Sequence, residues 1–255
     1  MCRHLAYLGP PVTLADVVLD PPHSLLRQSW APNDMRGGGT INADGFGIGW
    51  FDSGSGDGGP ARRYRRDVPM WSDSSLPDLA ESVSSEAILA AVRSATVGMP
   101  VTETACAPFV EGAWMFSHNG VVRGWPNSVA SLAGTLPPVD LMTLDAPTDS
   151  AFLWALVRHH LRQGHPAAKA LTDVVDDVLA LAPGSRLNLL LNDGLRITAI
   201  TAGHALWFCE GKDSITVSSE PLDPDEPGWQ PVPELSLLET TTNQCSIRSR
   251  DEGWS

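Results

Sequence analysis

The sequence predicts an α+β protein with layered sheets. Strand-like segments fill the first half of the chain, two consecutive amphipathic helices follow, and further strand-like segments fill the last third. This order is typical of sheets covered by separate groups of helices, rather than of alternating βαβ units. With 255 residues and 42% hydrophobic content, the chain can bury a substantial core. We therefore expect a single domain over residues 2–255.

The first half of the chain is predicted to be mainly strand. Residues 2–9 form the first strand, in which Cys2, His4 and Ala6 share one face because side chains alternate with a period of two. Residues 10–40 and 124–147 are Pro-rich and predicted to be irregular. The other predicted elements are strands over 46–51, 62–66, 87–95 and 114–116, a helix over 76–83, and a turn at His118-Asn119-Gly120.

The helical pair begins at Thr148, a good N-cap for a helix that runs to about Arg162. A second helix follows from about Pro166, and Gly184 marks its end. The strands predicted after it are 187–191, 195–201, 205–209 and 215–218, and Asn192-Asp193-Gly194 forms a hairpin turn between the first two. Residues after about Thr242 show little pattern, so we expect a loose tail.

Charge and composition exclude several classes of function. Seventeen basic residues against 30 acidic ones give a net charge of −13, which argues against a nucleic acid or an anionic membrane as partner. No apolar run approaches the roughly 20 residues that span a bilayer. Four cysteines without CxxC spacing argue against a metal site, and no cofactor motif is present. We expect a cytoplasmic protein with free thiols. A homo-oligomer is compatible with these observations.

Cys2 is the most informative residue. Removal of Met1 would leave a thiol and a free α-amine on one residue, and an α-amine ordinarily has a pKa of about 7.7–8.0. A thiol beside a base is the minimal equipment for covalent acyl transfer. Taken alone, however, Cys2 also fits a small buried residue in a first strand. His4, on the same face, would help to orient it.

Three further motifs follow Cys2: Val92-Arg93-Ser94-Ala95-Thr96, Phe116-Ser117-His118-Asn119-Gly120 and Pro147-Thr148-Asp149-Ser150-Ala151. Their order and spacing resemble the glutaminase domain of class II glutamine amidotransferases, which use an N-terminal nucleophile. The resemblance implies the four-layer αββα sandwich of N-terminal-nucleophile (Ntn) hydrolases. Periodicity alone would not give this architecture.

The resemblance also implies a role for each motif. Cys2 would be the nucleophile, and Asn119 and Gly120 would form the oxyanion hole. Arg93 would clamp the α-carboxylate of the substrate with help from Thr96, and Asp149 would bind its α-ammonium group. Without the resemblance, the same residues fit an Asn-Gly turn, an exposed arginine at a strand end, and an acid in the first turn of a helix.

Three more residues would complete the site. Asp44 would line it, Arg36 lies beside three glycines in a loop that would close over the substrate, and His118 would position Asn119. One departure from the family is Ala91, since a histidine often precedes the arginine by two residues there.

The substrate is predicted to be a small γ-glutamyl compound. About 70 residues follow the glutaminase-like region, too few for a typical ammonia-acceptor domain. The opening Met-Cys-Arg-His-Leu-Ala-Tyr-Leu-Gly resembles the amidohydrolases of ergothioneine biosynthesis, which release glutamate from γ-glutamyl-hercynylcysteine sulfoxide. Two alternatives stay open: a glutaminase subunit that delivers ammonia to a partner synthetase, and a non-catalytic binding protein that retains Met1.

Overall fold

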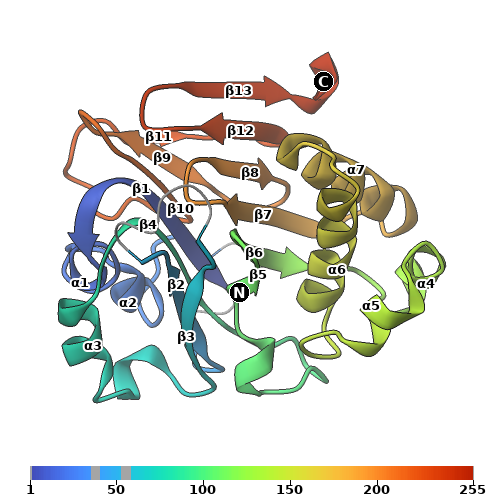
Figure 1. Cartoon of the computed structure of the whole chain (residues 1–255), viewed down its shortest axis with the longest axis horizontal. Helices are drawn as coiled ribbons and strands as arrows, with labels where there is room; N and C mark the ends of the chain where they lie inside the picture. The colour runs from blue at the N-terminus through green and yellow to red at the C-terminus, as the bar shows by residue number, and fades with distance from the viewer. Residues whose placement is uncertain (1, 36–40, 53–58, 255) are drawn as a thin grey trace.

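The computed structural model describes residues 2–35, 41–52 and 59–254 (Figure 1). One sheet contains β1 (Arg3–Thr13), β2 (Phe46–Trp50), β3 (Arg62–Arg66), β4 (Ser84–Val92), β9 (Trp207–Glu210), β10 (Ile215–Ser218) and β11 (Gln230–Pro231). The other contains β5 (Phe109–Glu111), β6 (Trp114–Val121), β7 (Arg186–Asn192), β8 (Ile197–Thr201), β12 (Ser236–Thr240) and β13 (Cys245–Ser249). Their strand orders are β11-β9-β10-β1-β4-β2-β3 and β13-β12-β8-β7-β6-β5, and every pairing is antiparallel.

Helices cover the outer face of each sheet (Figure 1). They are α1 (Leu14–Val18), α2 (Leu25–Gln28), α3 (Leu76–Ser82), α4 (Ala130–Ala133), α5 (Pro138–Met142), α6 (Asp149–Arg162) and α7 (Ala167–Leu181). One apolar cluster joins α1–α3 to the first sheet, and another joins α6 and α7 to the second. A third cluster lies between the sheets and includes Ala6, Leu89 and Leu190. The layers are therefore αββα, as the resemblance implied.

Strand β1, which follows Cys2, lies inside its sheet, between β10 and β4. Its antiparallel register with β4 places Arg3 opposite Val92. The start of β1 therefore lies beside the end of β4, and the residues just outside the paired segment, Cys2 and Arg93, come together although they are far apart in the sequence.

The prediction of a turn at His118-Asn119-Gly120 is wrong. Strand β6 continues through these residues to Val121 and pairs with β7 from Met115 to Val121. The glycine serves close packing instead of a turn, because a Cβ on Gly120 would lie 1.8 Å from the carbonyl oxygen of Arg186. An Asn-Gly pair can therefore mark either a turn or a close approach of two strands, and the local sequence does not distinguish the two.

The predictions of α3, α6, α7 and the hairpin are confirmed, whereas the segments predicted to be irregular contain the short helices α1 and α2 (within 10–40) and α4 and α5 (within 124–147). Thr148 caps α6, since its Oγ1 accepts a hydrogen bond from the Ala151 N–H at 3.2 Å. Asp193 Oδ1 accepts the Leu195 N–H at 2.9 Å in the turn between β7 and β8. The segment after Thr242 differs from the expected loose tail, because Cys245–Ser249 form β13 and pair with β12. Within the described residues, no helix is long and apolar enough to cross a membrane.

Candidate active site

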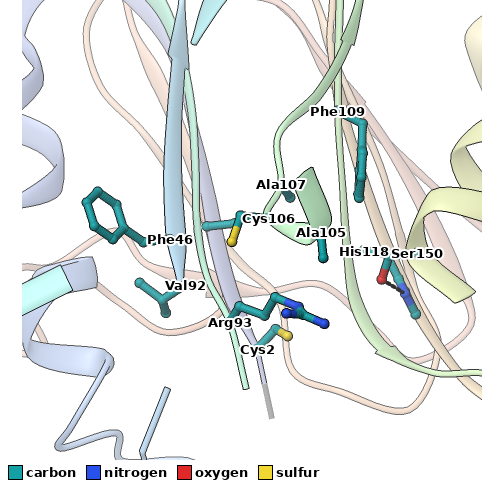
Figure 2. Close-up of a pocket in the computed structure, with 11 residues that line it drawn as sticks. Cys2, Phe46, Val92, Arg93, Ala105, Cys106, Ala107, Phe109, His118 and Ser150 are labelled. Carbon is teal, nitrogen blue, oxygen red and sulfur yellow. Dashed lines mark hydrogen bonds between the residues drawn. The ribbon is translucent and has the colours of Figure 1, made fainter. Parts of the chain in front are cut away.

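Cys2 and Arg93 line one pocket at the shared end of β1 and β4 (Figure 2). Cys106, His118 and Ser150 line the same pocket. The Cys2 thiol lies 3.7 Å from the carbonyl oxygen of Ser94, the residue after Arg93. The structure thus brings the predicted nucleophile and the predicted carboxylate clamp together.

The backbone around Arg93 is fixed on both sides. The Arg93 N–H donates to the Gly45 carbonyl at 2.8 Å, and the Asp44 N–H donates to the Arg93 carbonyl at 3.0 Å. Asp44 Oδ2 also accepts the Ala95 N–H at 2.8 Å. Asp44, predicted to line the site, therefore acts on the segment that presents the arginine.

The Arg93 side chain has no comparable restraint. Its Nη1 is buried and has no hydrogen-bond partner among the described residues. Arg93 as a whole is half-buried, but a charged N–H group that is shielded from solvent and makes no hydrogen bond is unfavourable unless a ligand supplies an acceptor. The pocket therefore suits an anionic group beside the Cys2 thiol.

Asn119 faces the space between the sheets, on the same face of β6 as Ser117. Ser117 Oγ lies 3.1 Å from His4 Nδ1 of β1, so this face of β6 looks toward the nucleophile strand. Asn119 is 1% exposed, and its Nδ2 donates only a long bond of 3.5 Å to Ser219 Oγ. The amide is thus held loosely and can donate to another acceptor.

His118 points to the opposite face of β6 from Asn119. Its contacts therefore do not support the expectation that it positions Asn119. Its Nδ1 lies 2.9 Å from Ser150 Oγ, and its Nε2 lies 3.0 Å from the Arg186 carbonyl oxygen. These bonds tie β6 to the start of α6 and to β7. His118 nevertheless lines the pocket with Cys2.

Asp149 is the first residue of α6 and contacts the residue that follows β6. Its Oδ2 accepts the Val122 N–H at 3.0 Å and its Oδ1 accepts the Ser150 N–H at 2.8 Å. The carboxylate is buried and retains lone pairs beyond these two bonds. Its contact with a substrate ammonium group stays a prediction.

Of the predicted site residues that the structure describes, Cys2, Arg93 and His118 line this pocket, whereas Asp44, Thr96, Asn119, Gly120 and Asp149 do not. Thr96 is exposed and lines a neighbouring cavity of about 510 Å³ with Val121, Val122 and Trp125. Arg36 lies outside the described residues.

Residues 20–233 match the family model of class II glutamine amidotransferases. The chain belongs to this family. It is 42% identical to the γ-glutamyl-hercynylcysteine sulfoxide hydrolase of Mycolicibacterium smegmatis, over 94% of this chain and 95% of the other. It is 39% identical to the protein of that name from Mycobacterium tuberculosis, over 98% and 97%. The fold resembles a class II domain protein from Silicibacter pomeroyi (TM-score 0.66, 23% identity, 97% and 99% covered).

In this class II glutamine amidotransferase, Arg3 also holds the backbone of Cys2, although no local sequence signal marks Arg3 for this role. Arg3 Nη1 donates to the Cys2 carbonyl at 3.1 Å, and Arg3 Nε pairs with Glu220 Oε1 at 3.0 Å. Arg3 Nη2 also donates to the carbonyl of Asp34. The guanidinium therefore links the Cys2 backbone to two distant segments.

Glu220 is the centre of that network and is 2% exposed. Its Oε2 accepts the Asn33 N–H at 2.8 Å and lies 2.7 Å from His23 Nε2. Burial raises the pKa of Glu220, but the hydrogen bonds and Arg3 outweigh burial, so that the pKa lies below its ordinary value. The neighbouring Ser219 contacts Asn119, so one short segment supports both Cys2, through Arg3, and Asn119.

The second thiol of the pocket is unreactive near neutral pH. Burial raises the pKa of Cys106 to about 11, although Arg93 and Arg65 lower it. A thiol reacts as its thiolate, so Cys106 stays protonated under ordinary conditions. This leaves Cys2 as the thiol of this pocket that can serve as a nucleophile.

Three buried histidines around the site are held neutral. Burial lowers the pKa of His4 to about 3, with further lowering from His118, His204 and Arg3. Burial and then Arg186 lower the pKa of His204 to about 3, and burial also lowers that of His118. None of the three rings therefore carries a charge at neutral pH.

The buried His4 should make the folded protein sensitive to acid. The unfolded chain protonates this ring below about pH 6.5, whereas the folded chain cannot do so until about pH 3. The free energy of unfolding should therefore fall between these values, by up to about 1.4 kcal/mol per pH unit from His4 alone. Urea unfolding at pH 7.5, 5.5 and 4.5 measures this slope.

The matched variant is His4→Asn, whose amide can keep the hydrogen bond to Ser117 without titrating. It should show a shallower fall in unfolding free energy than the unchanged protein over the same range. Identical slopes would mean that the ring of His4 is not held neutral.

Proposed function

We propose that this protein hydrolyses the γ-glutamyl amide of γ-glutamyl-hercynylcysteine sulfoxide to glutamate and hercynylcysteine sulfoxide. The observation that carries the proposal is the buried, unpartnered Nη1 of Arg93 in the pocket of the Cys2 thiol. The α-carboxylate of a γ-glutamyl group would pair with this cation and bring the γ-carbonyl to the sulfur. The near full-length relatives named for this reaction support the choice of substrate.

In the proposed reaction, removal of Met1 frees the α-amine of Cys2. The amine takes the thiol proton while Sγ attacks the γ-carbonyl carbon, and a C–S bond forms. Asn119 Nδ2 and the Gly120 N–H donate to the resulting oxyanion. The intermediate then collapses, the C–N bond breaks, and the protonated Cys2 amine gives its proton to the leaving nitrogen.

Hydrolysis of the γ-glutamyl thioester completes the cycle. Water attacks the same carbonyl as the Cys2 amine takes its proton, and the same donors stabilise the second oxyanion. The C–S bond breaks, glutamate is released, and the thiol regains its proton. No cofactor is needed, and the reaction requires a reduced thiol, which suits the cytoplasm.

The leaving amine of the proposed substrate carries a trimethylammonium group. Beyond Arg3, a cavity of about 520 Å³ is lined by Trp207, Asp34 and Glu220. An aromatic ring such as that of Trp207 is a favourable surface for a quaternary ammonium ion. This cavity lies next to the network that holds Cys2, and supports a preference for a cationic leaving group.

The test is glutamate release by the purified protein from four substrates. These are γ-glutamyl-hercynylcysteine sulfoxide, the corresponding thioether, glutathione and glutamine. We expect the highest kcat/KM for the sulfoxide and the lowest for glutamine. A preference for glutamine would overturn the proposal and favour a glutaminase subunit, and activity that rises with a co-purified partner would identify the ammonia acceptor.

A further inference from the structure

The connection between α6 and α7 gathers three side chains that the proposed reaction does not use. His160 lies in the last turn of α6, His165 lies in the connecting loop, and Asp173 lies on α7. Gly164 turns the chain with a φ of 83°, and the His165 N–H donates to the His160 carbonyl at 3.2 Å. The loop therefore folds the His165 ring back over the end of α6.

The three side chains converge on one point. His160 Nδ1 lies 3.0 Å from His165 Nδ1 and 3.9 Å from Asp173 Oδ2, and all three ligand atoms lie within 4.8 Å of one another. Tetrahedral zinc with bonds of about 2.0–2.2 Å separates its ligand atoms by roughly 3.3 Å. Small side-chain rotations would bring the observed separations to this value.

We propose that His160, His165 and Asp173 form a binding site for a divalent transition-metal ion, with zinc as the best match and water as the fourth ligand. Two imidazole nitrogens and one carboxylate favour zinc, nickel or copper over magnesium or calcium, which prefer oxygen ligands. The side chains of His160 and Asp173 are 22% and 32% exposed, so an ion can enter from solvent.

Lys169 competes for this site. Its Nζ donates to Asp173 at 2.9 Å and 2.8 Å, one turn away on α7. A divalent ion would displace this ammonium group, which costs little because the Lys169 side chain is 55% exposed. The lysine therefore lowers metal affinity without blocking the site.

Binding would join the end of α6 to α7 without touching the proposed reaction. The residues of α6 near Cys2 lie at its other end, and 14 helical residues span about 20 Å. We therefore expect the metal to raise thermal stability, because it binds the folded arrangement of the loop and not the unfolded chain.

The experiment is calorimetric titration of Zn²⁺, Ni²⁺ and Mg²⁺ into the chelator-treated full chain. It uses a Cys2→Ala background, which removes the Cys2 thiol as a competing ligand and leaves Cys106, whose raised pKa keeps it protonated. We expect saturable binding of one Zn²⁺ or one Ni²⁺ per chain, no binding of Mg²⁺, and a higher Tm with Zn²⁺. The readout is independent of activity, so its failure would not bear on the proposed function.

Variants of the cluster decide the assignment. His165→Ala and Asp173→Asn should each weaken Zn²⁺ binding by at least about tenfold. Lys169→Ala should strengthen it, and the matched control His159→Ala, whose Nε2 lies 2.9 Å from Gln163, should leave it unchanged. Absence of Zn²⁺ binding, or equal affinity in His165→Ala and the unchanged cluster, would overturn the proposal.

Discussion

Replacing Cys2 with alanine should abolish glutamate release from every γ-glutamyl substrate. The variant loses the sulfur that is proposed to form the thioester, while the proposed oxyanion donors and Arg93 remain in place without a nucleophile to assist. Removal of a catalytic nucleophile typically costs at least about 10⁴-fold in kcat. Since only one half-buried sulfur atom is lost, the free energy of unfolding should change by no more than about 1 kcal/mol. Coupled glutamate detection and urea unfolding measure the two effects.

Cys106→Ala provides the matched control, because Cys106 lines the same pocket but its pKa is raised to about 11. This variant should keep kcat/KM within about tenfold of the unchanged protein, since the removed thiol remains protonated. Iodoacetamide at neutral pH should label Cys2 before Cys106, as peptide mapping would show. Activity in Cys2→Ala, or its loss in Cys106→Ala, would show that the nucleophile is misassigned.

The proposed mechanism also requires removal of Met1. The proposed base is the α-amine of Cys2, and an attached Met1 would convert that amine into an amide without basicity. Active protein should therefore have an intact mass that lacks methionine. Full activity with Met1 retained would transfer the role of base to another group.

The fold could be predicted where a local signal marks each element. Thr148 caps α6 through its own hydroxyl, and Asp193 closes its turn through its own carboxylate, so a few neighbouring residues contain the whole cause. Asn119 and Gly120 had no such unique signal. The reason for glycine is the carbonyl of Arg186 on another strand, which appears only once β6 and β7 are paired.

The candidate site was predictable only in part for the same reason. Its motifs are each short and local, and their order along the chain carried the resemblance. The support of Cys2 is not local, because Arg3 and Glu220 lie 217 positions apart and Glu220 belongs to none of the motifs. Tertiary structure also separates Thr96 from the pocket that Arg93 lines. The short sequence spacing of Arg93 and Thr96 therefore does not mean that the two side chains line the same cavity.

Replacing Arg93 with methionine should lower kcat/KM by about 10²–10³-fold, mainly through a higher KM. The proposed carboxylate contact is made equally in the bound substrate and in the transition state, so its loss weakens binding more than it slows chemistry. Charge-assisted, bidentate pairing of this kind is worth several kcal/mol, and each 1.4 kcal/mol is about tenfold. Arg93→Lys keeps the charge but loses the fork, so it should recover only part of the affinity.

The stability of the same variant separates a binding role from a structural one. Nη1 of the half-buried Arg93 is shielded from solvent without a hydrogen-bond partner among the described residues, so methionine should remove an unsatisfied donor. The free energy of unfolding without ligand should then stay equal or rise, while binding of the product glutamate is lost. If unfolding free energy falls and KM is unchanged, the guanidinium is a structural group and the substrate carboxylate must bind elsewhere. If KM and the free energy of unfolding both rise in the variant, Arg93 destabilises the free protein and is needed for substrate binding, as expected of a functional residue.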